Sequence, residues 1–222
     1  MEKSKAEVLR YLGRRGQETP EELDSLVDEC IALTKETAYF RQAHLAFPIT
    51  SCGNGITLAG AELLLKGKDI ARHLSGCGKA VLLAATLGAE VDALINKWKY
   101  ADITRSFVLD ACATQLIEEF CGNLQRQIWE EAAASNLEAT WRFSPGYGDF
   151  PLDIQPHILE ALNAVRKIGL TCTDHYILLP RKSITAIIGL GKKTGLCAHG
   201  CSSCDMHDTC SFCEKDGVLN GY

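Results

Sequence analysis

The chain has 222 residues, of which 46% are apolar, so it is long enough to bury a hydrophobic core. Its 23 basic and 28 acidic residues give a formal charge of -5, and the basic residues form no stripe, which argues against nucleic acid as a partner. The longest strongly apolar run, residues 80–85, is far below the roughly 20 residues that cross a bilayer, and the N-terminus lacks a signal-peptide hydrophobic region. We therefore expect a cytoplasmic protein with no membrane partner.

The first forty residues predict two helices. Residues 6–12 have a short helical pattern, and the run Thr19-Pro20-Glu21-Glu22 resembles a capping box with proline in the first helical position. Apolar side chains then recur at spacings of three and four, so we expect the second helix to bury one face. These side chains are Leu23, Leu26, Val27, Cys30 and Ile31.

The next part of the chain predicts most of the β-structure. Between residues 45 and 65, short apolar runs are interrupted by glycine and asparagine, and residues 80–87 form a compact apolar run. Both patterns are typical of strands bounded by turns. A long helix is expected over residues 106–134, which contain no proline and carry an apolar side chain every three or four positions. Its buried stripe is Leu109, Cys112, Leu116, Phe120, Leu124 and Ile128, and Gly122 is its weak point.

A further helix is predicted to begin at Asp153, which can cap it, and to end at Gly169 after Arg166 and Lys167 in its last turn. The buried stripe expected for this helix is Ile158, Leu159, Leu162 and Val165. Residues 183–189 predict another strand, and the glycine-rich run that follows, through residue 195, ends the folded core.

The motif that points to function is Arg142-Phe143-Ser144-Pro145-Gly146-Tyr147, an Arg-x-x-Pro-Gly-Tyr run. It resembles the signature of the activation domain of cobalamin-dependent methionine synthase, in which this loop cradles S-adenosylmethionine. The similarity continues through Leu179-Pro180-Arg181-Lys182-Ser183 and covers roughly residues 80–190. The resemblance implies an α+β fold in which helices surround an antiparallel β-sheet, and the patterns above are compatible with that fold.

The resemblance also implies a function. In that family the domain delivers S-adenosylmethionine to cobalamin that has been oxidised to its inactive state. One electron and one methyl group then restore methylcobalamin. We therefore expect a methyltransferase component that works with a cobalamin-binding methionine synthase or corrinoid protein and an electron donor such as flavodoxin or ferredoxin. No segment of the 222 residues resembles the homocysteine, folate or cobalamin domains of methionine synthase, so the expected action is in trans.

The residues predicted to bind S-adenosylmethionine are Arg142, Pro145, Gly146, Tyr147 and Glu118. An arginine fork can pair bidentately with the ligand's carboxylate, Pro-Gly shapes a turn that lets the backbone approach a ligand, and tyrosine adds an aromatic wall. Glu118, or less favourably Glu119, could meet the ammonium from the long helix. The alternative is that Arg142 and Tyr147 only brace an irregular loop. No catalytic residue is predicted, because the expected task of the protein is to position S-adenosylmethionine rather than to act as an acid or a base.

The C-terminal segment carries a separate signal, five cysteines within 17 positions that include two Cys-x-x-Cys units. These are Cys197, Cys201, Cys204, Cys210 and Cys213. Four thiolates could hold an iron-sulfur cluster or structural zinc, and a redox-active thiol tail is a third possibility. The other six cysteines are scattered among apolar residues, which predicts buried thiols.

The expected organisation is one activation-domain-like domain over residues 1–195, with a helical part over about residues 1–40, and a metal-binding tail over residues 196–222. The competing functional hypothesis is a noncatalytic adaptor on the same fold that binds metal or a corrinoid protein but has lost the methyl-donor site. A methyltransferase for small molecules is disfavoured, because no base that could activate an acceptor is recognisable.

Overall fold

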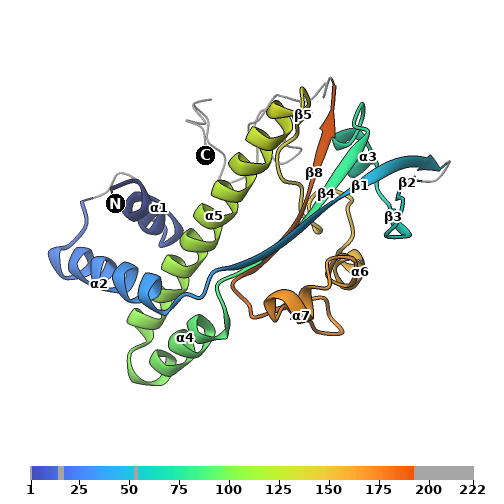
Figure 1. Ribbon diagram of the computed structural model, residues 1–222. Helices are drawn as coiled ribbons and strands as arrows, with labels where there is room; N and C mark the ends of the chain where they lie inside the picture. Colours follow the sequence, from blue (N-terminus) through green and yellow to red (C-terminus); the bar gives the residue numbers. More distant parts are fainter. Residues whose placement is uncertain (1, 15–17, 53–54, 193–222) are drawn as a thin grey trace. The chain divides into compact units, whose positions relative to one another are not determined.

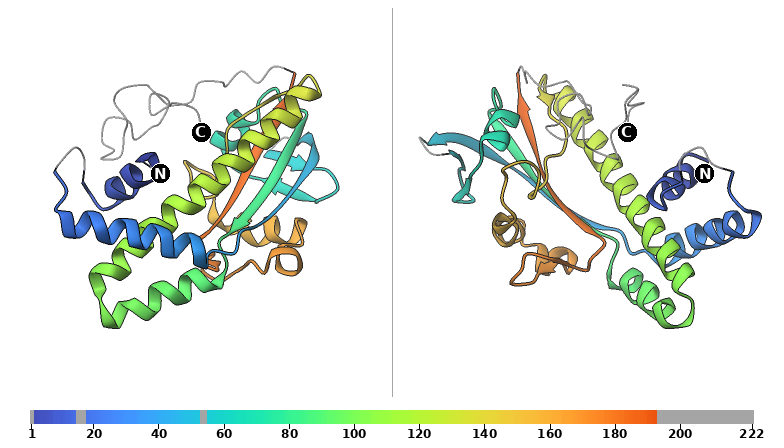
Figure 2. Two further views of the ribbon diagram at one scale, coloured as in Figure 1. Left: turned by 60° about the vertical axis from the view of Figure 1, so that its left-hand side comes forward. Right: turned by 180° about the vertical axis from the view of Figure 1, so that it is seen from behind.

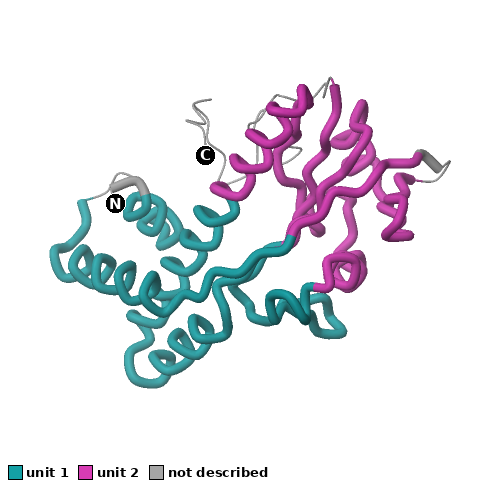
Figure 3. Tube along the Cα trace, in the orientation of Figure 1, with its two compact units in different colours: residues 1–43, 85–121, 164–184 teal, residues 44–84, 122–163, 185–222 magenta. Residues whose placement is uncertain are grey.

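The computed structural model describes residues 2–14, 18–52 and 55–192 (Figure 1). These residues form two compact units, shown in different colours in Figure 3. Of the described residues, unit 1 contains those within 1–43, 85–121 and 164–184, and unit 2 contains those within 44–84, 122–163 and 185–222. No helix in the described ranges is both long enough and apolar enough to span a membrane.

Unit 1 is mainly helical. Its elements are α1 (Glu2–Tyr11), α2 (Glu21–Thr37), α4 (Ala89–Ala101), the first part of α5 (Ile103–Ala134), α7 (Ala164–Ile168) and the short strands β6 (Thr171–Cys172) and β7 (Leu178–Leu179). Figure 2 shows from two sides that α1 and α2 lie beside the first half of α5. Val8, Val27 and Leu109 from these three helices are fully buried in one apolar cluster, so the predicted stripes of α2 and α5 meet there.

The start of α2 differs from the predicted capping box. The helix begins at Glu21, with Pro20 as its N-cap residue in an extended conformation and no side-chain capping bond. The carbonyl of Pro20 accepts the N–H of Asp24 at 2.9 Å. Because Pro20 itself lies outside the helix, the hydroxyl of Thr19 stands one residue too early to cap the first turn. Acidic side chains in that turn suit the positive end of the helix dipole instead.

The six-stranded sheet has the order β3-β2-β1-β4-β8-β5. Its strands are β1 (Arg41–Cys52), β2 (Gly55–Leu58), β3 (Leu63–Leu65), β4 (Lys79–Thr86), β5 (Glu138–Ala139) and β8 (Ser183–Gly191). Neighbouring strands run antiparallel: Ile49 lies opposite Leu58 in β1 and β2, and Glu138 lies opposite Gly191 in β5 and β8. The predicted α+β class with an antiparallel sheet is therefore confirmed.

In unit 2, the second part of α5 packs on the sheet. Ile128 from α5 lies in one buried cluster with Val81 of β4 and Ile188 of β8. Every residue of β4 after Lys79 is buried, which explains why this strand appears as an unbroken apolar run rather than as an alternating one. The long helix predicted over residues 106–134 is confirmed, and Gly122 lies within it without ending it.

The helix predicted from Asp153 is divided into a 3-10 turn (Leu152–Ile154), α6 (Gln155–Ala161) and α7. Asp153 makes no side-chain capping bond, so that part of the prediction is wrong. Leu162 is buried as expected, but Val165 is 61% exposed. The reason is the backbone conformation of Asn163, whose φ of 52° lies in the left-handed region. This conformation ends α6, so the helical phase of α7 is reset before Val165.

Candidate functional site

The motif loop, residues 140–150, belongs to unit 2 and runs beside β8. Phe143 and Ile187 exchange two backbone hydrogen bonds of 2.9 Å, forming an isolated antiparallel bridge. Thr140 donates its N–H to the Gly189 carbonyl at 2.9 Å, and the Gly189 N–H donates to Thr140 Oγ1 at 2.8 Å. The first half of the motif loop is therefore held by the sheet as if it were an irregular edge strand.

The Pro-Gly-Tyr part forms a tight turn. Gly146 has a φ of 91°, in the region that glycine adopts readily, and donates its N–H to the Phe150 carbonyl at 2.8 Å. Tyr147 donates its N–H to the Ser144 carbonyl at 3.1 Å, and Pro145 is buried. The positive φ that this turn requires thus explains why residue 146 is glycine.

Arg142 is half-buried and is oriented by Gln125 of α5. A single acceptor, Gln125 Oε1, receives the backbone N–H of Arg142 at 3.1 Å and its side-chain Nε–H at 3.3 Å. Gln125 itself is only 7% exposed. Sequence reasoning missed this residue, although a buried amide within the apolar stripe of a helix is a signal for a specific hydrogen bond.

Tyr147 stands at the border of an aromatic cluster formed by His73, Trp141, Phe143, Tyr147 and Phe150. Its ring contacts Phe143 edge-on, with centroids 5.8 Å apart and an interplanar angle of 79°. Phe143 is buried, whereas Tyr147 is 50% exposed. The cluster therefore fixes one edge of the Tyr147 ring while half of the residue's surface stays accessible, and its role as an aromatic wall for a ligand stays a prediction.

Asp149 attaches the motif loop to α3 (Lys68–His73). Its carboxylate accepts the N–H of Lys68 at 2.7 Å and the N–H of Asp69 at 3.0 Å, and its own N–H donates to Asp69 Oδ2 at 3.1 Å. These backbone donors, that of Asp69 foremost, lower the pKa of Asp149. Gly148 is in the left-handed region with φ 52°, and a Cβ there would collide with the Asp69 carboxylate.

The same loop is tied to the other end of α3 through His73. Its Nε2 lies 2.9 Å from Thr140 Oγ1, and both side chains are buried. Thr140 also accepts through its carbonyl the indole N–H of Trp129 at 2.8 Å. The loop that carries Arg142 is therefore fixed at three places: by β8, by α3 and by α5.

The predicted site residues fall into two groups. Arg142, Pro145, Gly146 and Tyr147 lie together on the motif loop in unit 2, whereas Glu118 is a half-buried residue on the part of α5 that belongs to unit 1. The role of Glu118 in binding the same ligand stays a prediction. Its neighbour Glu119 accepts a hydrogen bond of 3.4 Å from the Gln115 amide.

The cysteines also fall into two groups. The predicted metal ligands Cys197, Cys201, Cys204, Cys210 and Cys213 lie outside the described residues, so the tail metal stays a prediction. Within the described ranges, no group of three or more His, Cys, Asp or Glu side chains is arranged to hold a metal ion. Three cysteines there, Cys30, Cys112 and Cys121, are buried thiols, as expected, whereas Cys77 and Cys172 are only partly buried. Burial raises the pKa of Cys30 to about 11 and that of Cys112 to about 12.

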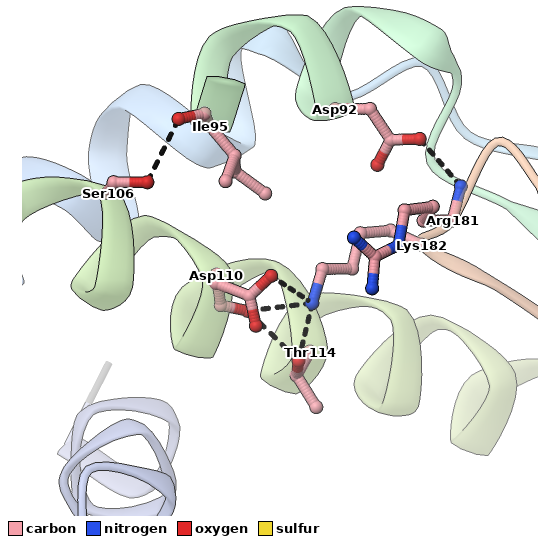
Figure 4. Close-up of polar contacts among 7 residues, drawn as sticks. All are labelled: Asp92, Ile95, Ser106, Asp110, Thr114, Arg181 and Lys182. Carbon is pink, nitrogen blue, oxygen red and sulfur yellow. Dashed lines mark hydrogen bonds and ion pairs between the residues drawn. The ribbon is translucent and has the colours of Figure 1, made fainter. Parts of the chain in front are cut away.

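A second polar cluster lies in unit 1 and involves the Leu179–Ser183 segment of the resemblance (Figure 4). Lys182 Nζ lies 2.9 Å from Asp110 Oδ1 and donates to the Asp110 carbonyl at 3.1 Å and to Thr114 Oγ1 at 2.9 Å. The N–H of Arg181 donates to Asp92 Oδ2 at 2.6 Å. Because all three ammonium hydrogens of Lys182 have an acceptor on one turn of α5, we interpret this cluster as a structural anchor.

Comparison with known proteins shows that this fold occurs in a solved structure. No family model matches the sequence, and a search of curated proteins gives no match. Among solved structures, the chain has the fold of a reactivation domain. One matching structure is that of the MetH reactivation domain bound to AdoHcy, with a TM-score of 0.62 and 17% sequence identity over 84% of this chain and 74% of that chain. At this identity the similarity establishes the α+β fold.

Proposed function

We propose that this chain binds S-adenosylmethionine through its motif loop and serves as a reactivation module for a cobalamin-dependent methyltransferase. The observation that carries the proposal is the combination of a reactivation-domain fold with the Arg-x-x-Pro-Gly-Tyr run on one rigid loop. The related MetH domain was solved with AdoHcy, the product that S-adenosylmethionine leaves after losing its methyl group.

The chemistry of the motif loop suits this ligand. Arg142 would pair with the carboxylate of S-adenosylmethionine, because a guanidinium binds a carboxylate in its own plane through parallel N–H donors. The half-exposed ring of Tyr147 would supply an apolar wall for the adenosine part. Glu118 is proposed as the partner of the ligand's ammonium group.

The proposed task of the protein is positioning. A methyl group leaves the sulfonium and bonds to cobalt in reduced cobalamin, so S-adenosylmethionine becomes S-adenosylhomocysteine and no proton is transferred. The protein would hold the sulfonium in line with the cobalt, which requires rigid binding groups rather than an acid or a base. The cobalamin would be carried by a corrinoid protein or methionine synthase, and the electron supplied by a flavodoxin- or ferredoxin-type donor. The tail cysteines are proposed to hold an iron-sulfur cluster or zinc.

The alternative is a noncatalytic adaptor, with which the contacts of the motif loop are equally compatible. The contacts that hold Arg142 to Gln125 and Tyr147 to Phe143 would be present in a loop that is merely braced. The two hypotheses differ in ligand binding, because an adaptor that has lost the methyl-donor site has no affinity for S-adenosylmethionine.

Equilibrium dialysis of the anaerobically purified full chain distinguishes them. The proposed function predicts saturable binding of both S-adenosylmethionine and S-adenosylhomocysteine with one ligand per chain, since both carry the same carboxylate and adenosine. Weaker binding of 5′-methylthioadenosine, which lacks both the carboxylate and the ammonium, would show that the amino-acid part of the ligand is recognised. Absence of saturable binding for all three ligands would favour the adaptor.

A further inference from the structure

We propose that Gln125 is a positioning residue that orients Arg142 for the carboxylate of S-adenosylmethionine. This inference rests on the proposed function of the motif loop. Gln125 contacts Arg142 through one atom, Oε1, which accepts from both the backbone and the side chain of the arginine. It lies on α5, 17 positions before Arg142 in the chain, so two separate segments of unit 2 meet at this contact.

The double contact restricts Arg142 in two ways. The bond to the backbone N–H fixes where the side chain leaves the loop, and the bond to Nε–H fixes the plane of the guanidinium, because Nε lies in that plane. A free arginine side chain samples many rotamers, and a ligand that binds only one of them loses affinity in proportion to that rotamer's population. Gln125 therefore increases the population of the arginine conformation that the carboxylate needs.

The chemical type of residue 125 also matters. The amide oxygen of glutamine is neutral, so it accepts hydrogen bonds without adding a negative charge of its own beside Arg142. A glutamate at this position would accept the same bonds but would add a negative charge beside the arginine and compete with the ligand's carboxylate. A neutral acceptor is thus suited to an arginine that must still attract an anion.

Gln155 offers a matched control for this contact. It is a buried glutamine of the same unit, 6% exposed against 7% for Gln125, and its Oε1 also accepts a buried hydrogen bond, from Thr185 at 2.9 Å. The test compares Gln125→Met and Gln155→Met in the full chain, because methionine preserves the length of the side chain and removes the amide. Binding of S-adenosylmethionine and of 5′-methylthioadenosine is measured by titration calorimetry.

Gln125→Met is expected to weaken binding of S-adenosylmethionine by about 3- to 10-fold and to leave 5′-methylthioadenosine binding within about twofold of the wild type. Gln155→Met should change neither affinity. In an Arg142→Ala background, Gln125→Met should have no further effect, because it acts through that arginine. Gln125→Glu, which keeps a polar side chain in case methionine unfolds the protein, should weaken S-adenosylmethionine binding selectively as well.

Two results would overturn the inference while leaving the proposed function intact: wild-type affinity for S-adenosylmethionine in both Gln125 variants, or an equal loss for the two ligands. The second result would mean that Gln125 only supports the loop. If the wild-type chain binds none of these ligands, the proposed function itself fails, and the role of Gln125 fails with it.

Discussion

Removing the ammonium of Lys182 tests whether the polar cluster of unit 1 is a structural anchor. Lys182→Met keeps most of the aliphatic side chain and deletes three contacts, those to the Asp110 carboxylate, the Asp110 carbonyl and the Thr114 hydroxyl. The side chain of Lys182 is 13% exposed, so its ammonium has little access to replacement water, whereas that of Asp110 is 52% exposed. The substitution therefore removes a largely buried ammonium group. One of its acceptors, the Asp110 carboxylate, is half-exposed to solvent.

The expected magnitude follows from these exposures. Hydrogen bonds of a charged group contribute about 1.5–3 kcal/mol when buried, and an ion pair with a half-exposed partner contributes about 0–1 kcal/mol. Thr114 Oγ1 still donates to the Asp110 carbonyl at 2.9 Å in the variant, so the loss is partly compensated. We expect Lys182→Met to lower the free energy of unfolding by about 1–2 kcal/mol.

Urea unfolding followed by circular dichroism measures this loss, with the midpoint compared at a common m-value. The control is Lys97→Met on the exposed face of α4, which should change stability by less than about 0.5 kcal/mol. Asp110→Asn should cost less than Lys182→Met, because the carbonyl of Asp110 and the Thr114 hydroxyl remain as acceptors. A loss for Lys182→Met no larger than that of the control would refute the anchor.

Two further predictions concern titrating groups. Because backbone donors lower the pKa of Asp149 below its unfolded value of about 3.9, its contribution to stability is complete above that value and is lost as the pH falls through the lower folded pKa. The difference in melting temperature between wild type and Asp149→Asn should therefore shrink as the pH falls below about 4, and a difference independent of pH would contradict the contact with α3. Since burial raises the pKa values of Cys30 and Cys112 to about 11 and about 12, iodoacetamide at pH 8 should leave both unlabelled until urea is added. Peptide mapping that finds either thiol labelled in the native chain would contradict its burial.

The regular elements could largely be predicted from apolar periodicity. The stripe of α5 was recognisable because Leu109, Leu116 and Ile128 are buried at helical spacing, and β4 because a short unbroken apolar run is typical of a strand covered on both faces. The break at Asn163 was not predictable in the same way. It depends on one left-handed residue, with no glycine or proline at that position to signal it.

The site was predictable to a smaller extent. The motif loop could be found because its residues are consecutive in the sequence, and proline and glycine mark its turn. The contacts that hold it could not, because they join residues distant along the chain: Asp149 binds the start of α3, 80 positions away, and Arg142 binds Gln125. Such pairings follow from tertiary packing, which local patterns do not encode.

The central claim, that Arg142 on the motif loop binds S-adenosylmethionine, is tested most directly by titration calorimetry of the full chain and its Arg142→Ala variant. Arg126→Ala, which removes an exposed arginine from α5 in the same unit, is the control. A charge-assisted contact of about 1.5–3 kcal/mol predicts that Arg142→Ala weakens binding about 10- to 150-fold while Arg126→Ala binds as the wild type does. Equal affinity in wild type and Arg142→Ala would contradict the assigned role of the loop.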